Sequence, residues 1–256
     1  MNDSMFDLTG EVALVTGASS GFGAHFARVL AQHGARVVVG ARRRDRLERL
    51  VQEITATGGE AHPVELDVCD SGSVEAAFDQ AEAMYGTVSV VSNNAGVADA
   101  RFALDIDEAS WDRLMETNLK GVWRVAMEAG SRLIAAGLTG SIVNTASILG
   151  LRVALAQSSY AVSKAAVVQL TRTLALEWGR KGVRVNALCP GYFITEMNEQ
   201  YLTSDKGRAY IHGTPARRTG ELNELTAPFL LLASNAGSFV NGVALPVDGG
   251  HSLGNI

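Results

Sequence analysis

Residues 11–33 read EVALVTGASSGFGAHFARVLAQH and pass from a short apolar segment through a glycine-rich loop into a stretch with helical apolar spacing. We expect a strand over residues 11–16 and a helix over residues 24–33. Glycine at positions 17, 21 and 23 lets the backbone approach a pyrophosphate, and the following helix N-terminus offers unpaired N–H groups and a partial positive charge. The loop predicts nucleotide binding, although any tight strand-to-helix turn uses glycine and the spacing Gly-x-x-x-Gly-x-Gly departs from the Gly-x-Gly-x-x-Gly fingerprint.

Outward from this stretch, apolar segments of strand length alternate with helical patterns. We expect strands at residues 11–16, 35–40, 63–68, 87–92, 141–146, 183–188 and 242–247. Apolar strands separated by helices predict a parallel sheet that is covered on both faces and joined by right-handed crossovers. The predicted fold class is therefore α/β, with a doubly wound parallel seven-stranded sheet of the Rossmann type. In such sheets ligands bind beyond the carboxyl ends of the strands.

The composition is that of one globular domain spanning residues 1–256. Hydrophobic residues make up 47% of the chain, which is enough to fill a sizeable core, and no repeat, charge block or Pro/Ser-rich linker divides it. The net charge of −5 and the lack of a basic face with interleaved aromatics argue against a nucleic-acid partner. The first residues lack the pattern of a secretion signal, and no apolar run is long enough to span a bilayer, so we expect a cytoplasmic protein.

The cysteines and histidines carry no metal motif. Cys69 and Cys189 have neither metal-ligand spacing nor a secreted context, so we expect free thiols. The 5 histidines are scattered, and we expect no metal site.

Tyr160 and Lys164 lie four residues apart in a stretch, residues 158–178, that has a helical pattern, and Ser147 follows an apolar strand upstream. Residues i and i+4 share one helix face, so the Lys164 ammonium can lie near the Tyr160 phenol. A positive charge there would lower the phenol pKa from its usual value of about 10 and allow proton exchange with a carbonyl or alcohol oxygen near neutral pH. Ser147 would donate a hydrogen bond to the same oxygen. Alternatively, the Tyr and Lys are paired by accident, with the ring packed and the ammonium in water.

Further motifs stand in a fixed order around this pair. They are Asn93-Asn94-Ala95-Gly96, Glu116-Thr-Asn118-Leu-Lys-Gly121, Pro190-Gly191 with Thr195, and Asp248-Gly249-Gly250. Together with Thr16–Gly23, Ser147, Tyr160 and Lys164, they make the chain from Thr9 to Gly250 resemble the short-chain dehydrogenase/reductase family, in a branch that includes 3-oxoacyl reductases. The resemblance implies a strand order of 3-2-1-4-5-6-7 and an oxidoreductase acting on carbonyl groups or secondary alcohols.

The resemblance also implies the site residues. The catalytic residues would be Asn118, Ser147, Tyr160 and Lys164. The cofactor-binding residues would be Gly17, Ser19, Ser20, Gly21, Phe22, Gly23, Arg42, Asp67, Val68, Asn94, Ala95, Gly96, Tyr160, Lys164, Pro190, Gly191, Phe193 and Thr195. Asn118 would position a water that reconnects Lys164 with solvent, or would be a buried polar residue at a helix irregularity. Asp67 would bind the adenine amine, with a helix N-cap as the competing role.

Cofactor choice depends on the end of the second strand. An acidic residue about twenty positions past the glycine loop binds the ribose 2′-hydroxyl of NAD, whereas an Arg there accommodates the 2′-phosphate of NADP. Here the strand ends in Arg42-Arg43-Arg44, with Arg42 nineteen positions after Gly23. Cations at the start of the next helix oppose its macrodipole, so an anion explains the cluster better than a solvated surface run. We expect NADP(H), with NAD(H) as the alternative.

The substrate is only broadly constrained. Residues 192–218 lack clear periodicity and are expected to cover the pocket as a lid. The expected substrate-binding residues are Ser147, Ile148, Leu149, Tyr192 and Met197. These side chains favour a modest apolar or aromatic carbonyl compound, but acyl-carrier ketoesters, sugars, steroids and quinones stay open.

Assembly is predicted from residues 158–178, which are apolar round most of the helix circumference. Because one apolar stripe is enough to pack on a sheet, the surplus face favours a homo-oligomer, most simply a homotetramer with a second contact through residues 239–247. A monomer is the alternative. The function classes left open are an NAD-linked secondary-alcohol dehydrogenase, a dinucleotide sensor without catalysis and a scaffold, and the intact catalytic set speaks against the last two.

Overall fold

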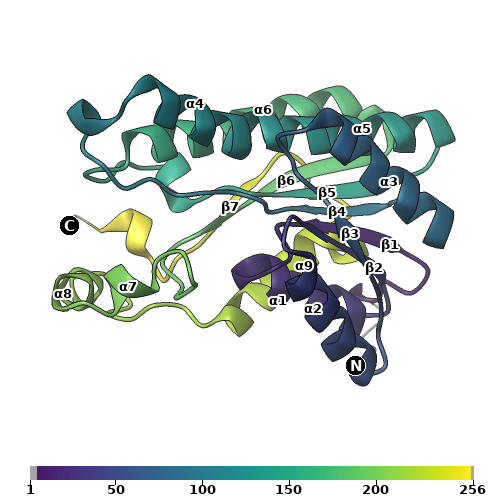
Figure 1. The fold of residues 1–256 in the computed structure, drawn as a ribbon, viewed down its shortest axis with the longest axis horizontal. Helices are drawn as coiled ribbons and strands as arrows, with labels where there is room; N and C mark the ends of the chain where they lie inside the picture. Colours follow the sequence, from purple (N-terminus) through teal and green to yellow (C-terminus); the bar gives the residue numbers. More distant parts are fainter. Residues whose placement is uncertain (1–4, 255–256) are drawn as a thin grey trace.

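A single seven-stranded parallel sheet forms the centre of the computed structural model, which describes residues 5–254 (Figure 1). Its strands are β1 (Val12–Thr16), β2 (Arg36–Ala41), β3 (Glu60–Glu65), β4 (Val90–Asn93), β5 (Gly140–Thr145), β6 (Val183–Pro190) and β7 (Ala244–Val247). Their order is β3-β2-β1-β4-β5-β6-β7, and every pair of neighbours is parallel. The predicted fold class and strand order are confirmed.

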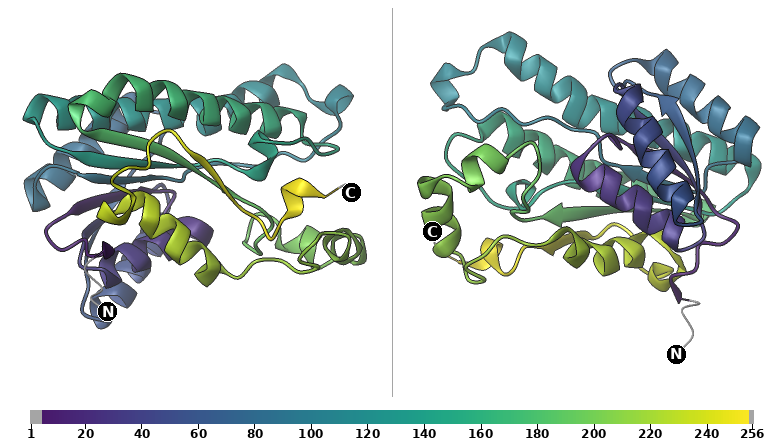
Figure 2. Two further views of the ribbon diagram at one scale, coloured as in Figure 1. Left: turned by 180° about the vertical axis from the view of Figure 1, so that it is seen from behind. Right: turned by 60° about the horizontal axis from the view of Figure 1, so that its bottom comes forward.

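Helices cover both faces of the sheet (Figures 1 and 2). One layer holds α1 (Gly21–Gln32), α2 (Arg44–Ala56) and α9 (Thr226–Ala233), and the other holds α3 (Ser71–Tyr85), α4 (Glu108–Met115), α5 (Val122–Ala136) and α6 (Ser158–Trp178). Each layer has its own core, with Phe26 of α1 stacked on Phe229 of α9 at 4.1 Å on one side, and with Phe78 of α3 and Leu174 of α6 in the core on the other. This double cover explains why a strand such as VALVT is buried at every position and apolar at its first four.

Two short helices lie apart from these layers. They are α7 (Glu199–Leu202) and α8 (Asp205–His212), at one end of the molecule near the last residues of the described chain (Figure 2). Both belong to the segment that we expect to act as a lid.

Three strand boundaries differ from the prediction by two or more residues at their start. β3 begins and ends three residues earlier than expected, β4 begins at Val90 instead of 87, and β7 begins at Ala244 instead of 242. β3 pairs only with β2, at the edge of the sheet, and an edge strand tolerates both polar residues and a proline such as Pro63. The polar residues Glu60 and His62 therefore belong to a strand that an apolar pattern does not reveal.

Other expectations agree with the structure. The helix predicted over residues 158–178 is α6, with the same limits. Cys69 and Cys189 are free thiols. Within residues 5–254, none of the helices has the length and hydrophobicity that crossing a membrane requires.

Candidate active site

The candidate site is built where the parallel strands end. The loops after β1, β4, β5 and β6 all begin on the same side of the sheet, at the carboxyl ends of the strands, because these four strands are parallel neighbours. The backbone of Ala146, after β5, also donates a hydrogen bond to Leu188 of β6 at 2.8 Å. The glycine loop, the Asn93–Gly96 segment and Ser147 are therefore brought to one crevice.

Ser147 starts a short 3₁₀ turn, Ile148–Gly150, and its hydroxyl accepts a hydrogen bond from the Leu149 N–H at 3.1 Å. The turn packs closely on α6. A Cβ at Gly150 would lie 2.7 Å from the Lys164 carbonyl oxygen, so only glycine fits this approach. Gly150 was not anticipated from the sequence, and it determines how near Ser147 comes to α6.

The pKa of Tyr160 differs from the prediction. Burial raises the pKa of the Tyr160 phenol to about 12, and the neighbouring Ser147 hydroxyl opposes this only in part. The predicted lowering by Lys164 is not found, because loss of hydration dominates and Lys164 is not among the groups that shift this pKa. At neutral pH the phenol keeps its proton and is a proton donor.

Lys164 lies on the same face of α6 as Tyr160, as expected from their spacing. Its side chain is buried, with 4% exposure, and its Nζ donates a hydrogen bond to the Thr145 carbonyl at 2.8 Å. Nζ lies 5.6 Å from the centre of the Tyr160 ring. Burial lowers the Lys164 pKa to about 8, so the charged ammonium form is disfavoured and depends on the hydrogen bonds that it donates.

Asn118 lies in a π-helical segment, Glu116–Gly121, and is fully buried. Its amide bonds both backbone groups of Val97, with Oδ1 accepting from N–H at 2.8 Å and Nδ2 donating to the carbonyl at 2.8 Å. Nδ2 also reaches the Ser163 hydroxyl at 3.3 Å, and that hydroxyl donates to the Tyr160 carbonyl at 2.7 Å. Asn118 therefore connects the loop after β4 to α6. It lies at a helix irregularity, as one of the two interpretations of the sequence expected. Its role in catalysis stays a prediction.

The glycine loop is shaped by close backbone contacts. Gly17 has φ +65°, and a Cβ there would lie 2.9 Å from the Ala95 Cα. A Cβ at Gly23 would meet the Gly17 carbonyl and would come within 2.7 Å of the Asn94 amide nitrogen. The Thr16 hydroxyl accepts hydrogen bonds from the backbone N–H groups of Asn94 at 2.9 Å and Ala95 at 3.0 Å. These bonds fasten the loops after β1 and β4 to each other.

The start of α1 fits an anionic ligand. Its N-cap residue, Ser20, makes no side-chain capping hydrogen bond, which leaves the first N–H groups of the helix to another acceptor. Together with the glycines that keep the backbone bare, this arrangement suits the pyrophosphate of a dinucleotide.

The segment after β6 faces this loop. The Thr195 methyl carbon lies 3.5 Å from the position that a Cβ on Gly21 would take, and the Phe193 ring packs edge-on against Phe22 at 5.7 Å. Asn198 holds the segment in shape, because its Oδ1 accepts from the Thr195 N–H at 2.9 Å and its Nδ2 donates to the Phe193 carbonyl at 2.9 Å. Upstream, Pro190 ends β6 and Gly191 N–H donates to Val247 at 2.9 Å.

Asp67 and Val68 follow β3. The Asp67 carboxylate accepts from the Cys69 N–H at 3.0 Å, whereas the N-cap of α3 is Asp70, which accepts from Gly72. The N-cap role considered for Asp67 is therefore wrong. Val68 packs against Gly121, where a Cβ would come within 2.7 Å of its side chain.

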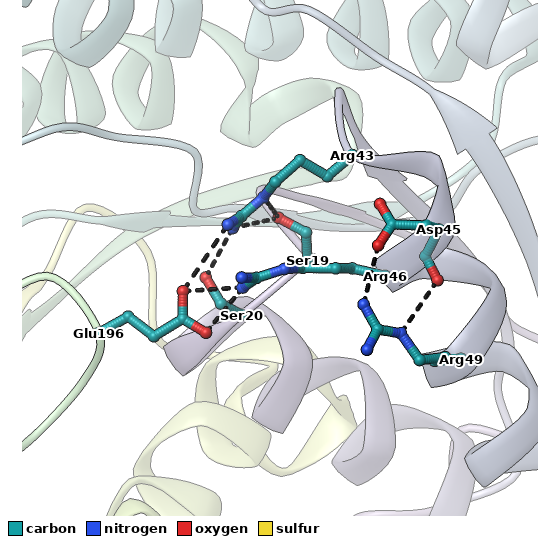
Figure 3. A network of polar contacts seen from close by, with 7 residues as sticks. All are labelled: Ser19, Ser20, Arg43, Asp45, Arg46, Arg49 and Glu196. Carbon is teal, nitrogen blue, oxygen red and sulfur yellow. Dashed lines mark hydrogen bonds and ion pairs between the residues drawn. The ribbon is translucent and has the colours of Figure 1, made fainter.

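The side chains of Arg42 and Arg43, which follow β2, point in different directions. Arg42 is exposed in the bend after the strand, and it makes no hydrogen bond or ion pair within residues 5–254. Arg43 turns toward the glycine loop and donates to the Ser19 hydroxyl at 2.8 Å and to the Ser20 hydroxyl at 3.1 Å (Figure 3). Sequence reasoning selected the arginine run but did not select Arg43, because side-chain direction in a bend cannot be derived from spacing.

The expected substrate residues differ in accessibility. Ile148 is buried, with 1% exposure, and Leu149 is also buried, whereas Met197 is exposed. Tyr192 is half-buried and contacts two residues that the sequence analysis missed. Its ring stacks on His251 at 5.2 Å and meets Tyr210 edge-on at 5.5 Å.

This aromatic cluster joins three parts of the chain. The Tyr210 hydroxyl and His251 Nε2 are 3.1 Å apart, so α8 is connected to the C-terminal turn. Burial raises the pKa of Tyr192, with smaller contributions from neighbouring tyrosines that include Tyr160.

A separate hollow of about 420 Å³ lies beside the loop after β4. It is lined by Val97, Ala98, Asp99, Arg101, Ser110, Arg113 and Leu114. None of the four candidate catalytic residues lines it, so we do not assign the reaction to this hollow.

Comparison with known proteins identifies the family. A family model described as enoyl-(acyl carrier protein) reductase matches residues 17–252. The chain belongs to the short-chain dehydrogenase/reductase family, and it is an oxidoreductase of the kind that acts on CH–OH and C=O groups.

Particular relatives are similar over almost the whole chain. Galactitol 2-dehydrogenase (L-tagatose-forming) of Cereibacter sphaeroides is 41% identical over 253 residues, which are 98% of each chain. Gluconate 5-dehydrogenase of Gluconobacter oxydans (strain 621H) is 36% identical, with 97% of each chain covered. A crystal structure of a gluconate 5-dehydrogenase from Burkholderia cenocepacia J2315 in complex with NADP and tartrate has a TM-score of 0.94, 35% identity and 98% coverage of both chains.

Proposed function

We propose that this chain is an NADP(H)-dependent oxidoreductase that interconverts a secondary alcohol and a ketone in a small polyhydroxylated molecule, such as a sugar alcohol or sugar acid. One observation carries the proposal: Ser147, Tyr160 and Lys164 stand together at the carboxyl ends of the strands, next to a glycine loop suited to a pyrophosphate. The substrate class is supported by the relatives named for galactitol and gluconate.

The nicotinamide of NADP(H), when bound, supplies or accepts the hydride. In the reductive direction, Tyr160 gives its proton to the substrate oxygen as negative charge develops there. The Ser147 hydroxyl donates a hydrogen bond to the same oxygen and stabilises that charge. The raised pKa of Tyr160 suits this direction, since the phenol is fully protonated at neutral pH. Lys164, held by the Thr145 carbonyl, would bind the nicotinamide ribose.

Other residues would hold the rest of the cofactor. The backbone at Gly21–Gly23 would bind the pyrophosphate, and Thr195 and the Asn94–Gly96 segment would flank the nicotinamide half. Arg42 and Arg43 would bind the 2′-phosphate, which agrees with the NADP found in the Burkholderia cenocepacia gluconate 5-dehydrogenase structure.

A polyhydroxylated substrate also agrees with the groups around Tyr160. An apolar or aromatic substrate is expected from Ile148, Leu149, Tyr192 and Met197, but Ile148 and Leu149 are buried. Tyr192 and Tyr210 are partly exposed and offer hydroxyls for hydrogen bonds to substrate hydroxyls, beside the exposed apolar side chains of Ile194 and Met197.

The test is a panel of ketones with NADPH as reductant. Ketohexoses and keto sugar acids should be reduced with higher kcat/KM than cyclic apolar ketones of equal size. Tyr160→Phe should lower kcat by a factor of about 10² to 10⁴ and leave NADPH binding intact, because it removes a transferable proton and little volume. More than a tenth of wild-type kcat in this variant would contradict the role of Tyr160, and preference for the apolar ketones would contradict the substrate class.

A second candidate is an NAD-linked secondary-alcohol dehydrogenase. It is favoured by one observation, the carboxylate of Glu196, which partly neutralises the arginines near the glycine loop. Titration of the protein with NADPH and NADH, followed by the fluorescence of the reduced cofactor, distinguishes the two candidates by their dissociation constants.

A further inference from the structure

Two arginines of the β2–α2 junction converge on a single carboxylate. Arg46 donates to both oxygens of Glu196, at 2.7 and 2.8 Å, and the Arg43 guanidinium lies 3.7 Å from the same carboxylate (Figure 3). Glu196 belongs to the segment after β6, so the contact joins parts of the chain that are 150 residues apart.

The arginine side of this contact lies at the glycine loop. Arg43 also donates to the Ser19 hydroxyl at 2.8 Å and the Ser20 hydroxyl at 3.1 Å. Arg43 therefore stands between the loop and Glu196, which is the position that an anion bound to the end of β2 and to the loop would share.

The Glu196 side is fixed by its neighbours. The Thr195 methyl group lies near Gly21, 3.5 Å from the position that a Cβ there would take, and the Asn198 amide holds the turn by hydrogen bonds to Thr195 and Phe193. Glu196 thus reaches the arginines from a turn that is held by hydrogen bonds between the Asn198 side chain and the backbone. The two arginines keep its pKa below the usual value, so it is a carboxylate at neutral pH.

We propose that Glu196 is a cofactor-selectivity residue, which occupies Arg43 and Arg46 in place of the 2′-phosphate and must be displaced when NADP(H) binds. This inference rests on the proposed function, in which arginines after β2 receive that phosphate. NAD(H) has no 2′-phosphate and leaves the Glu196 contacts in place. Displacement therefore weakens NADP(H) binding alone, and Glu196 reduces the preference that the arginines create.

Charge and exposure agree with a replaceable contact. The side chains of Arg43, Arg46 and Glu196 are 46%, 34% and 58% exposed, and ion pairs between such exposed groups are weak and screened by salt. A phosphate monoester carries about −1.5 to −2 charges and more acceptor oxygens than a carboxylate, so it competes effectively for two guanidinium groups.

The experiment measures binding of nucleotides that lack nicotinamide. Adenosine 2′,5′-bisphosphate carries the 2′-phosphate, and adenosine 5′-diphosphate does not. By calorimetry on the whole protein, Glu196→Gln should bind the 2′,5′-bisphosphate about two- to fivefold more tightly than wild type, with no change for the 5′-diphosphate. The gain should shrink as salt is raised, since it comes from an exposed charge.

Glu199→Gln is the matched control. It removes one negative charge from the same segment, at an exposed residue that makes no ion pair within residues 5–254, and it should not change either affinity. Equal gains in the two variants would show a general charge effect and overturn the proposal. An unchanged affinity for the 2′,5′-bisphosphate in Glu196→Gln would overturn it too. A weaker affinity would also overturn it, because it would show that Glu196 orients the arginines to bind the phosphate.

Arg43→Met separates this proposal from the proposed function. Arg44→Met, an exposed arginine of α2 that pairs with Glu48, is its control. Arg43→Met should weaken the 2′,5′-bisphosphate selectively. If it does not, Arg43 is not part of the phosphate site, and its assignment fails in both proposals. If it does, while Glu196→Gln has no effect, the arginine site stands and only the role of Glu196 is rejected.

Discussion

At the scale of single residues, burial controls the acid–base chemistry of the site. Tyr160 and Lys164 are held close together, yet the pKa of the phenol is raised to about 12 and that of the ammonium is lowered to about 8. Both shifts disfavour the charged form, which is the effect of removing each group from water. The protein alone therefore prepares a proton donor, and the same residue is a poor proton acceptor near neutral pH.

We predict an asymmetric pH dependence from this. Alcohol oxidation needs the Tyr160 phenolate, whose population rises about tenfold per pH unit while pH stays below the pKa of about 12. The kcat/KM for oxidation should rise from pH 7 to pH 8, the range in which Lys164 also keeps its proton, because kcat/KM reports ionisation of the free enzyme. Initial rates at constant ionic strength measure this. A maximum near pH 6 with a decline above it would contradict the assignment.

Cofactor preference gives a second prediction at this scale. Arg42→Asp places a negative charge where the 2′-phosphate is expected, so kcat/KM with NADPH should fall by about tenfold or more while that with NADH changes little. Arg49→Asp, which alters an exposed arginine farther along α2, is the control. Unchanged relative kcat/KM for the two cofactors would remove Arg42 from the site and leave Arg43 as the arginine in question.

At the scale of elements, glycines set how closely loops and helices approach. The glycine loop is the main example, because Gly23 has no room for a side chain against Gly17 and Asn94. We predict that Gly23→Ala shifts the loop and weakens NADPH binding at least about tenfold while the sheet stays folded. Fluorescence titration measures the affinity, and far-UV circular dichroism follows the fold.

Gly72→Ala is the comparison for that variant. The nearest atom to a Cβ at Gly72 is 3.5 Å away, which is an ordinary contact. This variant should bind NADPH like wild type. Equal affinity in Gly23→Ala and wild type would mean that the loop adapts without loss, and that the close contact at Gly23 has no bearing on the cofactor.

The elements also show what the sequence could and could not predict. Apolar runs located the buried strands, because a strand covered on both faces is mostly apolar, and helical apolar spacing located α6. It misplaced β3, an edge strand whose polar residues follow no such rule. Family motifs located Asn118, but the π-helical turn around it leaves no periodic signal in six residues.

Contacts between distant segments were beyond prediction for a different reason. Glu196 meets Arg43 and Arg46 only after β2 and β6 have taken their places in the sheet. The same holds for His251 and Tyr210, which pair through the folding of the C-terminal turn onto α8. The spacing of residues along the chain does not predict such long-range contacts.

At the scale of the whole molecule, apolar side chains are exposed on the layer that holds α5 and α6. The inner face of α6 is buried through residues such as Val167 and Leu174, whereas Leu176 on its outer face is 83% exposed. On the adjacent α5, Trp123 is 44% exposed and Met127 also reaches the surface. The exposed apolar side chains therefore lie on two helices, α5 and α6, whereas the sequence indicated only one. Exposed apolar side chains of this kind favour burial against a second copy of the chain.

We therefore predict a homotetramer, in which the α5–α6 face makes one interface and the edge strand β7, bonded on one side to β6, makes the other. Trp123→Glu combined with Leu176→Glu should reduce the assembly by placing charges in the first interface, as seen by sedimentation at micromolar concentration. Met84→Glu alters a side chain that is 50% exposed on α3, outside this face, and should leave the tetramer intact. If the wild type is a dimer and the two glutamates dissociate it, the helix interface stands and the strand interface is rejected. If the wild type sediments only as a species of 27.0 kDa, both interfaces are contradicted.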